Sequence, residues 1–178
     1  MSETVTISCG CGQTRLAVQG APIASVECCC TSCRTVSEKI ERLEGAPDIL
    51  TPYGATPFVM YRKDRVTFVS GVAGLREIRI SPEAKTRRVV ATCCNTPMFL
   101  EFSHGHWLSI YAGLWPDDLR PPVEMRTMAS DVVAGVVLPD DVPNAKSQSF
   151  GFFKRLLGAW IAMRFRVPKV AATQPLDG

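Results

Sequence analysis

The stretch Cys28-Cys29-Cys30-Thr31-Ser32-Cys33-Arg34 is the densest group of cysteines in the 178-residue chain. Cys9 and Cys11 come earlier, in a Cys-Gly-Cys-Gly sequence, and the adjacent pair Cys93 and Cys94 comes later. All eight cysteines belong to these three groups. Cysteines spaced this closely are typical metal ligands, so the sequence predicts a fold organised around metal sites.

The amino terminus indicates which cysteine chemistry to expect. Residues 1–15 contain no apolar run of the kind that a secretory signal peptide requires. We therefore expect a cytoplasmic protein, in a reducing compartment where disulfides are rare. In that setting the closely spaced cysteines predict metal or thiol chemistry before crosslinks.

Cys9 and Cys11 provide half of a predicted structural zinc site. The glycines that follow each of them let the backbone turn sharply, so both sulfurs can face one cation. A structural zinc needs four ligands in a tetrahedron, and Cys93 and Cys94 are the other pair in a strand-turn-strand setting. We therefore predict that Zn²⁺ is bound by Cys9, Cys11, Cys93 and Cys94.

Cys28, Cys30 and Cys33 form a second predicted zinc site. Cys30 and Cys33 make a CxxC pair at a helix start, and Cys28 in extended chain can supply a third sulfur. Three protein ligands leave a fourth position for water or substrate, which is the arrangement of a catalytic zinc. Arg34 and the helix-start amides favour thiolate over thiol. We predict Cys28, Cys30 and Cys33 as catalytic residues that hold a second Zn²⁺.

Two other interpretations of the cysteines stay open. Cys30 and Cys33 could form a thioredoxin-like redox pair, although that motif belongs in a βαβ setting and leaves the other groups unexplained. A single closed structural site with surplus buried cysteines, which pack as small apolar residues, is the second alternative.

Short segments rich in β-branched and aromatic residues predict a mainly β fold. Turn residues separate them, and the segment at residues 58–61 is apolar throughout, which indicates a strand buried on both faces. Residues 32–44 have helical periodicity and begin inside the central cysteine group. The predicted strands are Val5–Ser8, Thr14–Val18, Phe58–Arg62, Val66–Ser70, Leu75–Ile80, Arg87–Thr92, Met98–Phe102 and Trp107–Tyr111.

The carboxyl-terminal third has a different character. Prolines become frequent beyond Tyr111, and we divide the chain into a zinc-binding domain at 1–127, a linker at 128–151, and a basic amphipathic helix with its tail at 152–178. The helix, predicted over residues 152–166, is expected to pack on the body, on a second subunit or on a partner. Its apolar stretch is far shorter than the ~20 residues of a membrane span, so we do not expect a membrane protein.

The charge distribution argues against a nucleic-acid partner. The formal net charge is +3, but residues 150–178 hold five basic side chains against Asp177, so the rest of the chain is nearly neutral. A nearly neutral body offers no phosphate-binding surface, and nucleic acid is not an expected partner.

The order of the motifs resembles the glutathione-dependent formaldehyde-activating enzyme (GFA) family, whose domain has the tent-like, Mss4-like β fold. The resemblance runs from Ile7 to about Tyr111. Cys9-Gly-Cys-Gly matches the first family motif, and the stretch at residues 28–34 matches the second, usually CHCxxCR. Leu75–Pro82 followed by Arg88 resembles the strand and Ser-Pro turn before the third motif, usually CxxCGTP.

This resemblance implies a structural zinc on the first and third motifs and a catalytic zinc on the second. It implies a carbon–sulfur lyase that interconverts glutathione and formaldehyde with S-hydroxymethylglutathione, and hence a small thiol such as glutathione as ligand. Recognition of the carboxylates of glutathione would then fall to basic residues such as Arg15, Arg34, Arg62 or Arg88.

The chain departs from the family pattern at two places. Aligning Thr96-Pro97 with the family Thr-Pro puts Ala91 on the first cysteine of the third motif, and Cys93 replaces that ligand only if the chain bulges. Cys29 stands where the family has histidine, and a fourth sulfur could close the second site. A non-catalytic zinc-stabilised binding module is therefore the main alternative to the lyase, followed by a thiol redox protein.

Overall fold

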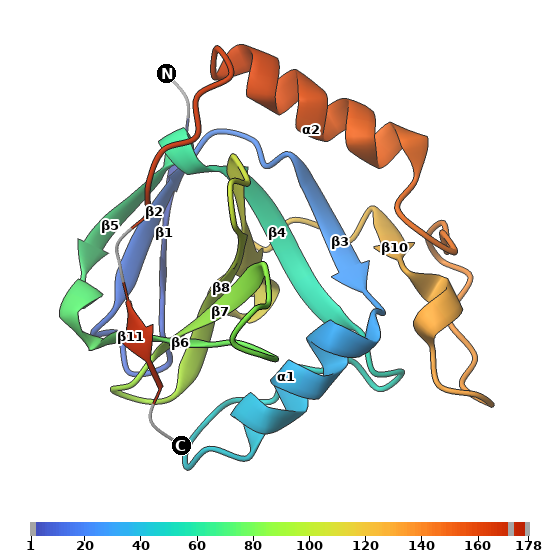
Figure 1. The fold of residues 1–178 in the computed structure, drawn as a ribbon, viewed down its shortest axis with the longest axis horizontal. Helices are drawn as coiled ribbons and strands as arrows, with labels where there is room; N and C mark the ends of the chain where they lie inside the picture. The colour runs from blue at the N-terminus through green and yellow to red at the C-terminus, as the bar shows by residue number, and fades with distance from the viewer. Residues whose placement is uncertain (1–2, 171–172, 177–178) are drawn as a thin grey trace.

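The β-rich segments pair into two sheets in the computed structural model, which describes residues 3–170 and 173–176 (Figure 1). The smaller sheet has the order β1-β2-β5, is antiparallel, and consists of β1 (Thr4–Ser8), β2 (Arg15–Gln19) and β5 (Val66–Ser70). The mainly β fold class with a carboxyl-terminal helix is confirmed.

The larger sheet has the order β10-β3-β4-β9-β8-β7-β6-β11. Its two outermost pairs, β10 with β3 and β11 with β6, are parallel, and the pairs between them are antiparallel. Its strands are β3 (Ala24–Cys28), β4 (Thr56–Arg62), β6 (Leu75–Ile78), β7 (Thr86–Ala91), β8 (Thr96–Phe102), β9 (Trp107–Tyr111), β10 (Met125–Thr127) and β11 (Gln174–Pro175).

The main core lies between the two sheets. Leu16 and Val18 of the smaller sheet pack in one cluster with Val59, Phe99 and Ile110 of the larger sheet. The other face of the larger sheet is covered by the helices, so β4 is buried on both faces. This explains why the sequence of β4 is apolar throughout rather than alternating.

Helix α1 (Thr31–Glu41) begins at the second cysteine group. Cys30 is its N-cap, and the Cys30 sulfur accepts a hydrogen bond from the backbone N–H of Cys33. Val36 and Ile40 form its buried face, as the helical periodicity predicted. The helix is shorter than the predicted 32–44, because the chain turns at Leu43, whose N–H donates to the Ile40 carbonyl.

Helix α2 (Phe150–Ala162) packs on the body, along the upper right of the molecule in Figure 1. The Ser149 hydroxyl caps its first turn by accepting from the Phe152 N–H. Phe152 and Leu156 are buried in a cluster with residues of β3, β4 and β8. His106 Nε2 donates to the Leu156 carbonyl at 2.9 Å, which ties the helix to the turn before β9.

Buried Arg126 of β10 holds the segment that precedes α2 against the large sheet. Its Nη1 donates to the Pro139 carbonyl at 3.0 Å and to Asp141 at 2.7 Å, and its Nε donates to Glu27 of β3 at 2.6 Å. Short 3-10 helices occupy several connections: Lys63–Arg65, Val72–Gly74, Ala112–Leu114 and Ala129–Asp131. Within the described residues, neither α-helix combines the length and the apolarity needed to cross a bilayer.

Candidate metal centres

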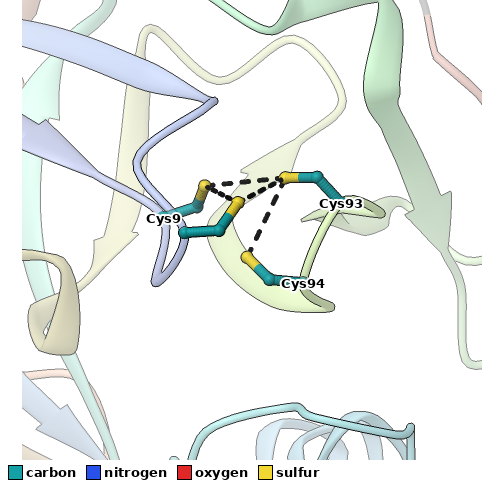
Figure 2. A group of neighbouring side chains, drawn as sticks. Cys9, Cys93 and Cys94 are labelled. Atoms are coloured by element: carbon teal, nitrogen blue, oxygen red, sulfur yellow. Dashed lines mark hydrogen bonds between the residues drawn. The ribbon is translucent and has the colours of Figure 1, made fainter.

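Two turns bring the first set of cysteines together, one from each sheet. Cys9 and Cys11 lie in the turn between β1 and β2, and Cys93 and Cys94 lie in the turn between β7 and β8 (Figure 2). Asn95 has a φ of 52°, a left-handed conformation that turns the chain sharply after Cys94. The four sulfurs lie within 4.8 Å of one another and could hold a metal ion.

The spacing of these sulfurs suits zinc. Four ligands at the usual Zn–S distance of about 2.3 Å form a tetrahedron whose edges measure about 3.8 Å. The Cys9 sulfur lies 3.6 Å from the sulfurs of Cys11 and Cys93. The Cys93 sulfur lies 3.2 Å from that of Cys11 and 3.9 Å from that of Cys94. The donor set and its dimensions therefore fit a tetrahedral Zn²⁺.

Cys93 takes part in this group, whereas Ala91 is the buried last residue of β7. Strand alternation does not apply to Cys93 and Cys94, because β7 has already ended and both residues lie in a turn. The turn, rather than a bulge at the pair itself, lets two neighbouring sulfurs face the same point.

The surroundings favour thiolates at two of these four positions. Burial raises the pKa of Cys94, but the Thr96 hydroxyl and the Cys11 backbone and thiol lower it, and its pKa is about 6. Burial also raises the pKa of Cys9, but the Thr14 N–H, 3.3 Å from its sulfur, leaves that pKa lowered overall. Burial and neighbouring thiols raise the pKa of Cys93 to about 12, so a proton stays on that sulfur until a cation displaces it.

Cys28, Cys30 and Cys33 form the second group at the junction of β3 and α1. Their sulfurs lie within 4.8 Å of one another and could hold a metal ion. Cys29 lies outside the group: its side chain is buried, and its N–H donates to the Thr127 carbonyl of β10. Successive residues at a strand end point to opposite sides, so the extra cysteine does not supply a fourth sulfur here.

Cys30 carries the negative charge of this group most readily. Hydrogen bonds from the thiols of Cys28 and Cys33 lower the pKa of Cys30 to about 2. Hydrogen bonding to Cys30 raises the pKa of Cys28. Cys28 lowers the pKa of Cys33, but Cys30 and burial raise it to about 11. The thiolate at Cys30 also receives the Cys33 N–H at 3.3 Å, at the amino terminus of α1.

Arg88, rather than Arg34, is the cation beside these three sulfurs. The Arg88 Nη2 lies 3.8 Å from the Cys33 sulfur and 2.9 Å from the Ser32 hydroxyl, and the side chain is buried. Its Nε has no hydrogen-bond partner among the described residues. The guanidinium of Arg34, the arginine that the sequence analysis named for this role, donates to the Asp131 carbonyl.

A cavity of about 300 Å³ lies against Cys28, Cys30 and Cys33. Arg88 is the one basic side chain in its lining among the described residues, and Arg15, Arg34 and Arg62 are not part of it. Most of the wall is apolar and comes from β3, β4, β8, β9 and α2, with Val26, Phe58, Met60, Leu100, Trp107 and Phe152. The three cysteines therefore border a small and mostly apolar chamber.

The two histidines do not join either cysteine group among the described residues. His106 is buried and donates to the Leu156 carbonyl, and its ring stacks on that of Trp160 at 5.7 Å. His104 is exposed in the turn between β8 and β9. The sequence also failed to indicate that Phe152, predicted only as a residue of the terminal helix, closes the cavity beside Cys33.

No family model matches the chain, and no curated protein matches it. Among solved structures, a crystal structure of a Rhodobacter sphaeroides protein is similar with a TM-score of 0.47 and 12% sequence identity. That similarity covers 79% of this chain and 99% of the other.

Proposed function

We propose that the chain binds two zinc ions and that the second, on Cys28, Cys30 and Cys33, serves thiol chemistry as a carbon–sulfur lyase. One observation carries the proposal: three sulfurs converge on a cavity while Cys29 is directed away. Three protein ligands with an accessible fourth position are the hallmark of a catalytic zinc. The first site, which joins turns of the two sheets, has the closed set of a structural zinc.

The proposed reaction joins or separates a thiol and an aldehyde. The thiol sulfur adds to the carbonyl carbon, a carbon–sulfur bond forms, and the carbonyl oxygen takes up the proton that the thiol loses. The reverse step breaks that bond and returns the proton to sulfur. Bound zinc would supply a Lewis acid that keeps the substrate sulfur as thiolate.

The residues of the chain have separate roles in this proposal. Cys28, Cys30 and Cys33 hold the metal, and buried Arg88 balances the negative charge that gathers when a fourth thiolate approaches. Ser109 and Gln148 line the cavity and offer hydrogen bonds to the aldehyde oxygen. Phe152 and Trp107 keep water away from the adduct.

The cavity lining favours a thiol with an apolar body over glutathione. Glutathione brings two carboxylates, whereas the described lining offers one cation, Arg88, which already donates to Thr86 and Ser32. A buried carboxylate without a partner is strongly unfavourable. Apolar thiols such as benzyl mercaptan are therefore the first substrates to test, with glutathione beside them.

The second candidate is a zinc-stabilised module that binds a small thiol without turnover. The absence of carboxylate and imidazole groups from the described cavity lining favours it, because proton transfer usually uses such groups. A redox role for Cys30 and Cys33 has less support: Cys28 lies within the same group, and β3 pairs antiparallel with β4 rather than entering a βαβ unit.

The test measures by NMR how fast formaldehyde exchanges between its free form and its thiol adduct. The rate with zinc-loaded protein is compared with the rate without protein. Catalysis that exceeds the background and is lost in Cys33→Ser supports the lyase. Cys29→Ser is the matched control, because it makes the same atomic change next to the group but outside it. Exchange at the background rate, together with saturable thiol binding, would favour the binding module.

A further inference from the structure

Helix α2 presents a second apolar stripe to solvent, apart from the face that packs on the body. Phe150 is 80% exposed, Phe153 and Leu157 are each 51% exposed, and Ile161 is 53% exposed. These residues are three or four positions apart, so they follow one side of the helix for about 16 Å. Phe165, just beyond the helix, is 60% exposed. Large apolar side chains lined up in solvent indicate an interaction surface.

The stripe continues from the helix onto the sheet. Phe150, Phe153 and Leu157 share a shallow groove of about 560 Å³ with Phe102 and Trp107 from β8 and β9. Phe102 is itself 37% exposed. The apolar surface is therefore contiguous across two elements rather than a row of isolated side chains.

Lys154 lies beside this surface, and the chain segment that carries the stripe is rich in basic residues. Residues 142–176 contain six lysines and arginines and no aspartate or glutamate. The Lys154 ammonium lies 5.8 Å from the centre of the Phe150 ring. Arg155 pairs with Glu124, whereas no described carboxylate forms an ion pair with Lys154, Arg164, Arg166 or Lys169. The partner of this surface must therefore combine an apolar layer with negative charge.

We propose that α2 docks the protein on the surface of an anionic phospholipid bilayer. The aromatic and aliphatic stripe enters the boundary between headgroups and acyl chains, while Lys154, Arg164 and Arg166 contact phosphate groups. A second copy of the chain complements the stripe but not the charge, because two such helices would bring like cations together. The shortness of α2 excludes only a bilayer span, not a position in the plane of the interface.

The experiment uses the full zinc-loaded chain and sedimentation with large vesicles. We expect binding to vesicles of phosphatidylcholine mixed with phosphatidylglycerol, weaker binding to phosphatidylcholine alone, and loss of binding as salt is raised. The double variant Leu157→Gln/Ile161→Gln should weaken vesicle binding roughly tenfold or more, because two aliphatic side chains no longer enter the membrane interface while the charge is unchanged. Val137→Gln is the control, since Val137 is 87% exposed but lies outside the stripe.

Several results would overturn the proposal. Binding of neutral and anionic vesicles to the same extent would remove the role of charge, and an equal loss in Val137→Gln would remove the role of the stripe. No vesicle binding by the wild type would refute it outright. A dimer that dissociates in Leu157→Gln/Ile161→Gln would instead assign the stripe to a second copy. Unchanged thermal melting of the variants would show that each result reflects docking rather than unfolding.

Discussion

The Nη2 of Arg88 lies 3.8 Å from the Cys33 sulfur, and both side chains are buried. Arg88 comes from β7 and Cys33 from the first turn of α1, so the contact joins two elements that are far apart in the sequence. A buried guanidinium beside a thiol stabilises its thiolate form. The relationship makes Arg88 the charge partner of the candidate metal site at Cys28, Cys30 and Cys33.

Arg88→Met should weaken metal binding at the second site about 10- to 100-fold, the usual effect of losing a group that supports metal ligands. Competition with a chromogenic chelator measures it, and circular dichroism checks the fold. Arg34→Met is the matched control, because the Arg34 guanidinium donates to Asp131 and Thr31. An equal loss of affinity in Arg34→Met would contradict the assignment.

The two cysteine sites should respond differently to substitution. Cys94→Ser should remove the proposed zinc between the β1–β2 turn and the β7–β8 turn, and structural zinc contributes on the order of 10 kcal/mol in small zinc domains. We expect that variant to melt far below the wild type. Cys33→Ser should keep the fold and retain one zinc per chain. Elemental analysis and thermal melting measure both, and equal unfolding by the two variants would refute the division of roles.

Substitution of two neighbouring phenylalanines of α2, Phe152 and Phe153, should have different effects on protein stability and on ligand binding. Phe152 is buried against the cavity, so Phe152→Ala should destabilise the fold by about 3 kcal/mol and weaken the binding of an apolar thiol. Phe153→Ala should change the free energy of unfolding by less than about 0.5 kcal/mol, because its ring is half exposed. Urea unfolding and thiol titration of the cobalt-substituted protein measure these effects. Equal behaviour of the two variants would contradict the placement of α2.

His106 should make the folded state sensitive to mild acid. Burial lowers its pKa below the ordinary value of 6.5, so the unfolded chain binds the proton more readily than the folded one. Neutral His106 therefore contributes to the free energy of unfolding in full above pH 6.5, and this contribution is lost as the pH falls through the lowered pKa. The free energy of unfolding, measured with urea between about pH 7.5 and 5.5 with zinc in excess, should depend less steeply on pH in His106→Gln than in the wild type. His104→Gln should keep the wild-type slope, and a flat wild-type profile would count against this prediction.

Local patterns were sufficient for much of this fold. Strands such as β4, β5 and β9 were found from the sequence, because β-branched and aromatic residues between turns record the local backbone preference. The strand β3 was missed: its sequence, Ala-Ser-Val-Glu-Cys, has weak strand propensity. The pairings of β10 and β11 were also missed, because those short outer strands form through long-range contacts.

The sequence by itself determined that the cysteines lie in three clusters and that Cys28, Cys30 and Cys33 can meet, since close spacing along the chain limits how far their sulfurs can separate. Only the tertiary structure decided how each group is completed. It placed Cys93 in a turn where its sulfur meets those of Cys9 and Cys11, and it turned Cys29 away from the second site. It also brought Arg88 to Cys33 and Phe152 to the cavity. These contacts join residues far apart in the chain, and their positions follow from sheet register and helix packing, which no local spacing encodes.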